Sequence, residues 1–364
     1  MQYLQRTIWY TANQTIEVLD QRYLPHQINI IELSSTAQVI TAIKDMIVRG
    51  APLIGATAAF GVYFACQETQ HQTNKEEYFN QQIENLKNSR PTAVNLFWAI
   101  NKQLNAISVT KDWYTKTKIA WQTALQIVED DVKICKQIGE HGLLLLEELA
   151  RKKKEKKINI LTHCNAGRLG CIEWGTATAP IYLAHKQGLQ VHVWVDETRP
   201  RNQGASLTAW ELQQAGIPHT VIADNTGGHL MQHHQVDICI VGTDRATCQG
   251  DIANKIGTYL KALAAKDNGI PFYVALPSTS IDWNIKNGLT EIPIEERTPD
   301  EVRYITGWNG KKIEKVLLTP ADSPALNIGF DVTPARLITG LITERGICQA
   351  NEESMLALFP EAKK

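Results

Sequence analysis

Residues 158–167, INILTHCNAG, begin as an apolar, β-rich segment and end in polar and small side chains. A second segment of the same kind, VHVWVDETRPRNQG, occupies residues 191–204. From here on, short β-rich segments alternate with helical ones, which is the pattern of a parallel sheet covered by helices. The sequence predicts strands at 158–161, 191–195, 220–223, 238–241, 272–276 and 316–318.

The residues before about 151 predict a different architecture, with helices following a small antiparallel sheet at 7–10 and 15–19. Ser35 and Thr36 suit the cap of a helix over 37–46, and Pro52 suits the first turn of the next helix. Further helices are predicted to begin at Pro91 and to span 121–149. We therefore expect an α/β protein with a smaller, mainly helical domain over 1–150 and a Rossmann-like domain over 151–364.

Composition excludes several classes of protein. The 364 residues are 43% hydrophobic and 21% charged, with a mean hydropathy of −0.23, which is typical of a soluble globular chain. The formal net charge of −1 provides no field for nucleic acid or an anionic membrane. The apolar stretch 51–66 is too short to span a bilayer and predicts a buried helix. Seven cysteines without zinc-site spacing predict reduced thiols in the cytoplasm and no metal.

Polar clusters follow three of the predicted strands. Cys164 follows the first, residues 196–204 follow the second, and Asp244 follows the fourth. Ligands of open parallel sheets bind beyond the carboxyl ends of the strands, so Cys164 and Asp244 are expected to face one crevice. Backbone N–H groups and a helix dipole can activate such a cysteine, although most cysteines, like Cys239, fill a core. Asp244 could instead pair with Arg245 or cap a helix.

Anion binding is predicted where basic or small residues begin helices, because free N–H groups there favour a phosphate. Arg49, Gly50 and Ala51 precede one helix, and Arg90 precedes another. Asn254 and Lys255 are expected in the first turns of a helix over 251–265. Together these residues suggest one small phosphorylated ligand. The chain has no phosphate-loop, dinucleotide, hydrolase-elbow or zincin motif, so we predict no nucleotide cofactor.

Longer motifs carry a family resemblance. These are VRGAPLIGATAAFG from Val48, THCNAG from Thr162, DETRPRNQGASLTAWEL from Asp196, GTDR and QGDIANKIGTY within 242–259, and FDVTP from Phe330. They resemble the methylthioribose-1-phosphate isomerases, whose family also contains the alpha, beta and delta regulatory subunits of translation initiation factor 2B. The resemblance implies a homodimeric cytoplasmic enzyme of methionine salvage, without a cofactor, that converts 5-methylthioribose 1-phosphate to 5-methylthioribulose 1-phosphate.

The resemblance also assigns roles to residues. It implies that Asp244 is the proton donor and that Cys164 stabilises the transition state. The matching substrate-binding positions are Arg49, Gly50, Ala51, Arg90, Gln203, Asn254 and Lys255. Three segments depart from the family pattern: 242–244, 327–331 and 168–174. The last adds bulk after the THCNAG motif and could alter substrate preference.

Two other functions share this fold. A non-catalytic regulatory subunit would not need both Cys164 and Asp244. A ribose 1,5-bisphosphate isomerase would need cationic groups for a second phosphate, for which Arg199 and Arg201 are candidates. For the isomerase, hydrogen could move from C2 to C1 as a hydride or through an enediol, and the sequence leaves both routes open.

Overall fold

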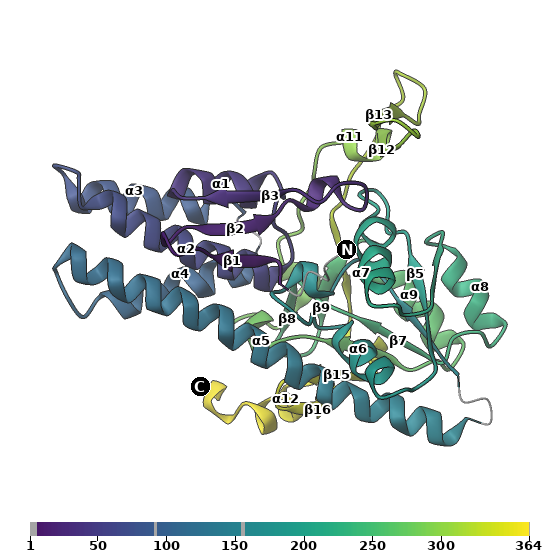
Figure 1. Cartoon of the computed structure of the whole chain (residues 1–364). Helices are drawn as coiled ribbons and strands as arrows, with labels where there is room; N and C mark the ends of the chain where they lie inside the picture. Colours follow the sequence, from purple (N-terminus) through teal and green to yellow (C-terminus); the bar gives the residue numbers. More distant parts are fainter. Residues whose placement is uncertain (1–5, 91–92, 154–156, 364) are drawn as a thin grey trace. The chain divides into compact units, whose positions relative to one another are not determined.

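The computed structural model describes residues 6–90, 93–153 and 157–363, which form two compact units (Figure 1). The first unit comprises Met1–Tyr23, Ile28–Lys136 and Arg168–Gly175, and the second comprises Leu24–Gln27, Gln137–Gly167 and Thr176–Lys364. The chain thus leaves the second unit at residue 168 and re-enters it at residue 176. The domain boundary near residue 150 stays a prediction.

The first unit combines a small antiparallel sheet with helices, as predicted. Its strands pair in the order β1-β2-β3, with β1 at Ile8–Tyr10, β2 at Ile16–Leu19 and β3 at Ile30–Leu33. Ser35 caps α1 by accepting a hydrogen bond from the backbone N–H of Gln38. The helices are α1 (Thr36–Lys44), α2 (Ala51–Thr69), α3 (Lys75–Lys87), α4 (Val94–Ile107) and the first part of α5 (Trp113–Lys152).

Helix α2 is the centre of this unit. It begins at Ala51 with Pro52 in its first turn, and nearly all of its side chains are buried, which confirms the predicted buried helix. Within the described residues, no helix combines the length and the apolar character that crossing a membrane requires. The long helix expected at 121–149 is α5, which is longer at both ends. The predicted helix start at Pro91 lies outside the described residues.

The second unit contains a seven-stranded sheet in the order β16-β15-β10-β7-β4-β5-β6. Every neighbouring pair is parallel except β15 and β16. Strands β4, β5 and β6 extend the sheet in one direction and β7, β10 and β15 in the other, so the order reverses between β4 and β7. The strands are β4 (Ile158–Thr162), β5 (Val191–Asp196), β6 (His219–Ile222), β7 (Ile238–Val241), β10 (Phe272–Ala275), β15 (Gly340–Thr343) and β16 (Gly346–Cys348).

Helices cover both faces of this sheet, which confirms the Rossmann-like prediction. Leu161, Cys239 and Val241 share one core with side chains of α8, α9 and α12. On the other face, α5 packs closely on α6 and on Ile342 of β15. Because crossovers between parallel strands are right-handed, the reversal of the strand order between β4 and β7 places helices on both faces. The bounds are α6 (Ala179–Lys186), η3 (Gly204–Thr208), α7 (Ala209–Gln214), α8 (Thr226–Gln232), α9 (Thr258–Asp267) and α12 (Glu352–Leu358).

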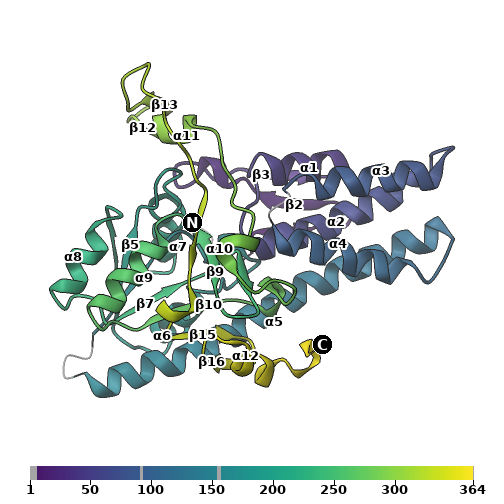
Figure 2. The ribbon, with the colours of Figure 1, turned by 180° about the vertical axis from the view of Figure 1, so that it is seen from behind.

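Two predicted elements are wrong. Residues 316–318 do not form the sixth parallel strand; most of them belong to the antiparallel hairpin of β12 (Tyr304–Trp308) and β13 (Ile313–Leu317), which stands apart from the sheet in Figures 1 and 2. The sixth strand is β15, whose four residues GLIT are a weak signal beside the longer β-rich hairpin.

The second wrong element is the helix over 251–265. Residues Ile252–Lys255 are strand β9, and helix α9 begins only at Thr258. Strand β9 pairs antiparallel with β14 (Phe330–Thr333), which supplies partners that a local sequence pattern does not reveal. The small sheet runs in the order β11-β8-β9-β14. Its other strands are β8 (Arg245–Thr247) and β11 (Ile281–Asp282), and the short helix α10 (Gly288–Glu291) contacts β14. The short helix α11 (Asp300–Arg303) lies instead beside the β12–β13 hairpin (Figure 1).

Candidate active site

The site begins where the strand order reverses. Cys164 follows β4 and Asp244 follows β7, and these two strands are parallel neighbours. Their following loops also touch: a Cβ atom added to Gly242 would lie 2.4 Å from the Cβ of Ala166. In open α/β sheets, the crevice at such a reversal is where ligands bind.

The Cys164 thiol is held in a polar loop. Its backbone has φ 65°, and its N–H donates to the Oγ1 of Thr198 at 2.8 Å. The Oγ1 of Thr208 donates to the Cys164 carbonyl at 2.7 Å. The thiol itself donates to the Oε1 of Gln203 at 3.5 Å. Cys164 and Gln203, both predicted from sequence, are therefore direct neighbours.

Several residues in the loops after β4 and β5 have strained backbone conformations. Cys164, Thr198 and Asn202 all have left-handed φ angles, which cost energy for residues other than glycine. The Asp224 carboxylate helps to hold this geometry by accepting hydrogen bonds from the N–H groups of Thr198 and Arg199, at 2.7 and 2.8 Å. Such concentrated strain is typical of functional sites, where the surrounding structure keeps groups in place for a ligand.

A buried charge network beneath these loops was missed by the sequence reasoning. His163, next to Cys164, contacts the Asp196 carboxylate through Nδ1 and the Ile256 carbonyl through Nε2, both at 2.8 Å. The ammonium of Lys261 lies 3.3 Å from the same Asp196 carboxylate. Burial raises the pKa of Asp196, and His163 and Lys261 oppose that rise. His163 thereby links the ends of β4 and β5 to the turn after β9. The sequence signal that could have identified His163 is its position next to Cys164.

The side chains of His163, Asp196 and Asp224 are close enough to share a metal ion. Both Asp224 oxygens accept backbone N–H groups, and the Lys261 ammonium lies beside one Asp196 oxygen, Oδ2. The other Asp196 oxygen, Oδ1, is buried and has no hydrogen-bond partner among the described residues. The contacts of Asp224 and Lys261 are those of a network that positions the loops.

Asp244 is half-buried and lies beside strand β9. Its N–H donates to the carbonyl of Ala253 at 3.0 Å, so it is adjacent to Asn254 and Lys255. Arg245 forms an ion pair with Asp282, which removes the alternative that Arg245 neutralises Asp244. The carboxyl group of Asp244 accepts no hydrogen bond from any residue that the structure describes.

Asn254 and Lys255 are placed by a strand, so the predicted reason for their position is wrong. Both side chains are buried, and the Lys255 ammonium lies 4.2 Å from the centre of the Phe330 ring. The start of α9 is not open to phosphate, because the Asp331 carboxylate accepts the N–H groups of Gly257 and Tyr259, at 2.7 and 3.1 Å. Any contact with a phosphate in this region must come from the side chains of β9.

The remaining predicted residues lie in the first unit. Arg49 is buried and Gly50 is the N-cap of α2. Gly50 has φ 84°, and a Cβ there would lie 2.3 Å from the Cα of Gly170, so only glycine fits. Helix α4 runs alongside α2 in the same direction. Asn95 packs at Gly55, and Gln103 donates to the carbonyl of Ala59. Arg90, just before α4, is thus at the same end of this helix pair as Arg49.

Comparison with known proteins identifies relatives over nearly the whole chain. The model of the initiation factor 2 subunit family matches residues 47–350. The chain is 57% identical to a methylthioribose-1-phosphate isomerase of Desulfatibacillum aliphaticivorans, covering 99% of this chain and 98% of the relative. It is 53% identical to the enzyme of that name from Sinorhizobium medicae, covering 98% and 97%.

Solved structures give the same picture. The 5-methylthioribose 1-phosphate isomerase of Pyrococcus horikoshii superposes with a TM-score of 0.84 at 40% identity, covering 98% of this chain and 96% of that one. A structure described as the delta subunit of translation initiation factor eIF-2B from A. fulgidus superposes with a TM-score of 0.79 at 34% identity, covering 98% and 100%. The chain is therefore similar both to proteins named as an isomerase and to one named as a subunit of a translation initiation factor.

Proposed function

Since the chain belongs to the initiation factor 2 subunit family, and within it to the methylthioribose-1-phosphate isomerases, we propose that it converts 5-methylthioribose 1-phosphate to 5-methylthioribulose 1-phosphate in methionine salvage. The observation that carries this proposal for the present chain is the placement of Cys164 and Asp244 after the two neighbouring strands where the sheet order reverses. A thiol and a carboxyl group thereby follow the carboxyl ends of two adjacent parallel strands.

The chemistry requires an acid. The phosphate on the anomeric oxygen of the substrate blocks the spontaneous ring opening on which ordinary sugar isomerases depend. In our proposal, protonated Asp244 donates to the ring oxygen as its bond to C1 breaks. The position of Asp244 suits this role, because its carboxyl has no partner among the described residues and Arg245 is engaged by Asp282.

Hydrogen then moves from C2 to C1. In one route it moves as a hydride to the cationic C1; in the other, Cys164 carries the proton through an enediol. The hydrogen bond from the Cys164 thiol to Gln203 places a proton-bearing sulfur next to a proposed substrate-binding amide. The strained loop around Cys164 supports a role at the reacting carbons, since its cost is otherwise unexplained.

The substrate-binding residues remain proposals within each unit. In the first unit, Arg49 and Arg90 supply charge, and Gly50 and Ala51 begin α2. In the second unit, Gln203, Asn254 and Lys255 are the proposed contacts.

The two alternative functions are less well supported. Arg199 and Arg201, the candidates for a second phosphate, are engaged by α11: Arg199 donates to the carbonyl of Val302 at 2.8 Å, and Arg201 pairs with Glu301 at 2.8 Å. Burial opposes the ionisation of Glu301, but Arg297 and Arg201 lower its pKa to about 2. A purely regulatory role would leave the proton donor and the thiol without a use.

Turnover of 5-methylthioribose 1-phosphate and of ribose 1,5-bisphosphate, measured side by side, tests the proposal. We expect ketose formation from the methylthio sugar at a much higher kcat/KM; no turnover, or preference for the bisphosphate, would contradict it. Repeating the reaction in deuterated water separates the two routes, since complete retention of hydrogen at C1 supports the hydride shift and solvent exchange supports the enediol.

We further propose that the protein is a cytoplasmic homodimer. Light scattering of the purified chain across a range of concentrations measures its oligomeric state directly, and a monomer at micromolar concentration would contradict the dimer.

A further inference from the structure

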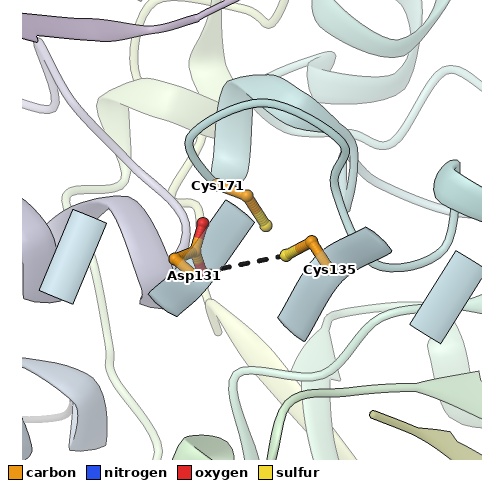
Figure 3. Close-up of side chains that lie close together, drawn as sticks. All are labelled: Asp131, Cys135 and Cys171. Carbon is orange, nitrogen blue, oxygen red and sulfur yellow. Dashed lines mark hydrogen bonds between the residues drawn. The ribbon is translucent and has the colours of Figure 1, made fainter. Parts of the chain in front are cut away.

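A second group of ionisable side chains belongs to the first unit and includes none of the proposed active-site residues. Asp131 and Cys135 are one turn apart on α5, and Cys171 comes from the segment Arg168–Gly175. The carboxylate and the two sulfurs all lie within 4.8 Å of one another, and Figure 3 shows the three side chains converging. Both cysteines are buried, Cys135 completely and Cys171 to 2% exposure.

The Asp131 carboxylate connects the two thiols. One oxygen accepts a hydrogen bond from the Cys135 thiol at 3.7 Å, and the other accepts the backbone N–H of Ile172 at 3.0 Å. Because Ile172 is the residue after Cys171, this carboxylate keeps the segment that carries one thiol beside the helix that carries the other.

We propose that Cys135 and Cys171 are a redox-active pair that closes reversibly to a disulfide, with Asp131 accepting the first proton. The sulfurs, which lie within 4.8 Å of each other, must approach to about 2 Å for the bond to form. A cytoplasmic disulfide of this kind would be transient and responsive to oxidant, unlike the permanent bridges of secreted proteins.

The chemistry balances with hydrogen peroxide as the oxidant. Asp131 takes the Cys135 proton, and the thiolate attacks one peroxide oxygen. The O–O bond breaks, giving a sulfenic acid and hydroxide, which recovers the proton from Asp131 as water. The Cys171 sulfur then attacks the sulfenic sulfur, the S–O bond breaks and a second water leaves. Two thiols and one peroxide thus become one disulfide and two waters, and a small dithiol reverses the change.

The surroundings favour a redox pair over a metal site. A structural zinc site needs four ligands, and this group supplies three among the residues that the structure describes. The neighbouring Cys171 thiol and burial raise the pKa of Cys135 well above its ordinary value, which opposes formation of the thiolate, so closure needs a base beside this thiol. Asp131 is that base, and burial raises its pKa to about 7. Such a carboxyl is still ionised in part near neutral pH and can accept a thiol proton.

A disulfide here would fix a segment that contacts another functional region. Gly170, next to Cys171, is the residue against which Gly50 packs. The bond would therefore join α5 covalently to the backbone beside the proposed phosphate-binding turn. That consequence rests on the proposed function, whereas formation of the disulfide does not.

Peptide mapping tests the proposal on the full chain. Reduced protein is treated with hydrogen peroxide at equal concentration, alkylated under denaturing conditions and digested with trypsin without reduction. Cleavage after Lys133, Lys136, Arg168 and Lys186 releases Cys135 in peptide 134–136 and Cys171 in peptide 169–186, while Cys164 is in peptide 158–168. We expect the first two peptides to be linked and to be separated by dithiothreitol.

Four variants complete the test. Cys135→Ser and Cys171→Ser should each abolish the link, Cys66→Ala should retain it because that buried thiol of the same unit lies outside the group, and Asp131→Asn should slow closure by about tenfold or more. Separate alkylation of both thiols after peroxide treatment, or a link from Cys171 to Cys164, would overturn the proposal. So would stoichiometric zinc in the purified reduced protein that both serine variants lose.

Discussion

Two regions of this molecule each combine thiol and carboxyl groups, and their surroundings give them different chemistry. At the sheet edge, the Cys164 thiol meets an amide, and the Asp244 carboxyl has no partner among the described residues. In the group of Asp131, Cys135 and Cys171, the Cys135 thiol donates to the Asp131 carboxylate, and the Cys171 sulfur lies within 4.8 Å of both. The first arrangement leaves reactive groups available to a ligand, whereas the second directs them at each other. Residue type alone therefore does not distinguish a catalytic pair from a redox pair.

The largest expected difference between the two regions is in their carboxyl groups. Asp244→Asn should lower kcat by about two to four decades, because the general acid is lost while the shape of the site is kept. Asp131→Asn should leave kcat nearly unchanged under reducing conditions. Steady-state kinetics on both variants make the comparison, with circular dichroism as the control for folding. Near-normal turnover in Asp244→Asn would remove that residue from the proposed role.

Replacing the thiol at the sheet edge should also lower kcat more than replacing a thiol of the second group, but by a smaller factor than for the carboxyl groups. Cys164→Ser should lower kcat by about 10²-fold, since a hydroxyl keeps the hydrogen bond to Gln203 but is a weaker acid and nucleophile. Cys171→Ser serves as the matched variant and should retain activity in the presence of dithiothreitol. Equal losses in the two variants would erase the distinction between the regions.

How far the sequence predicts these regions depends on how local their determinants are. Cys164 and Asp244 could be found because each follows an apolar strand, and parallel strands present their ends at one edge. Asn254 and Lys255 were predicted to bind an anion from the first turns of a helix, whereas they lie on strand β9, because the pairing of β9 with β14 depends on residues far along the chain. Their role in binding stays a prediction. Cys135 and Cys171 come together only through the fold of the first unit, and no spacing rule links them.

A pH-dependent effect on stability comes next in size. Burial raises the pKa of Asp131 from its usual 3.8 to about 7. A carboxyl whose pKa is higher in the folded state favours folding at low pH, and that contribution is lost as pH rises from about 4 to 7. Between pH 5.5 and 8, the wild type should therefore lose about 2 kcal/mol of unfolding free energy relative to Asp131→Asn. Urea unfolding at both pH values, under reducing conditions, measures the difference. A constant difference between the two proteins would show that Asp131 is ionised throughout this range.

The smallest effect concerns the residue that supports the sheet-edge thiol. His163 contacts an oxygen atom through each ring nitrogen, the Asp196 carboxylate through Nδ1 and the Ile256 carbonyl through Nε2. His163→Asn keeps a donor near Asp196 and His163→Gln keeps one near Ile256, but neither side chain spans the gap. Each should lower kcat by about tenfold with a smaller change in KM, because the loop holding Cys164 loses one of its anchors while the phosphate contacts remain. A rise in KM with unchanged kcat would instead place His163 in substrate binding. If both variants lost stability but kept normal kcat and KM, His163 would be a structural residue of the core. The hydrogen bonds of Thr198 and Asp224 would then hold the strained loop.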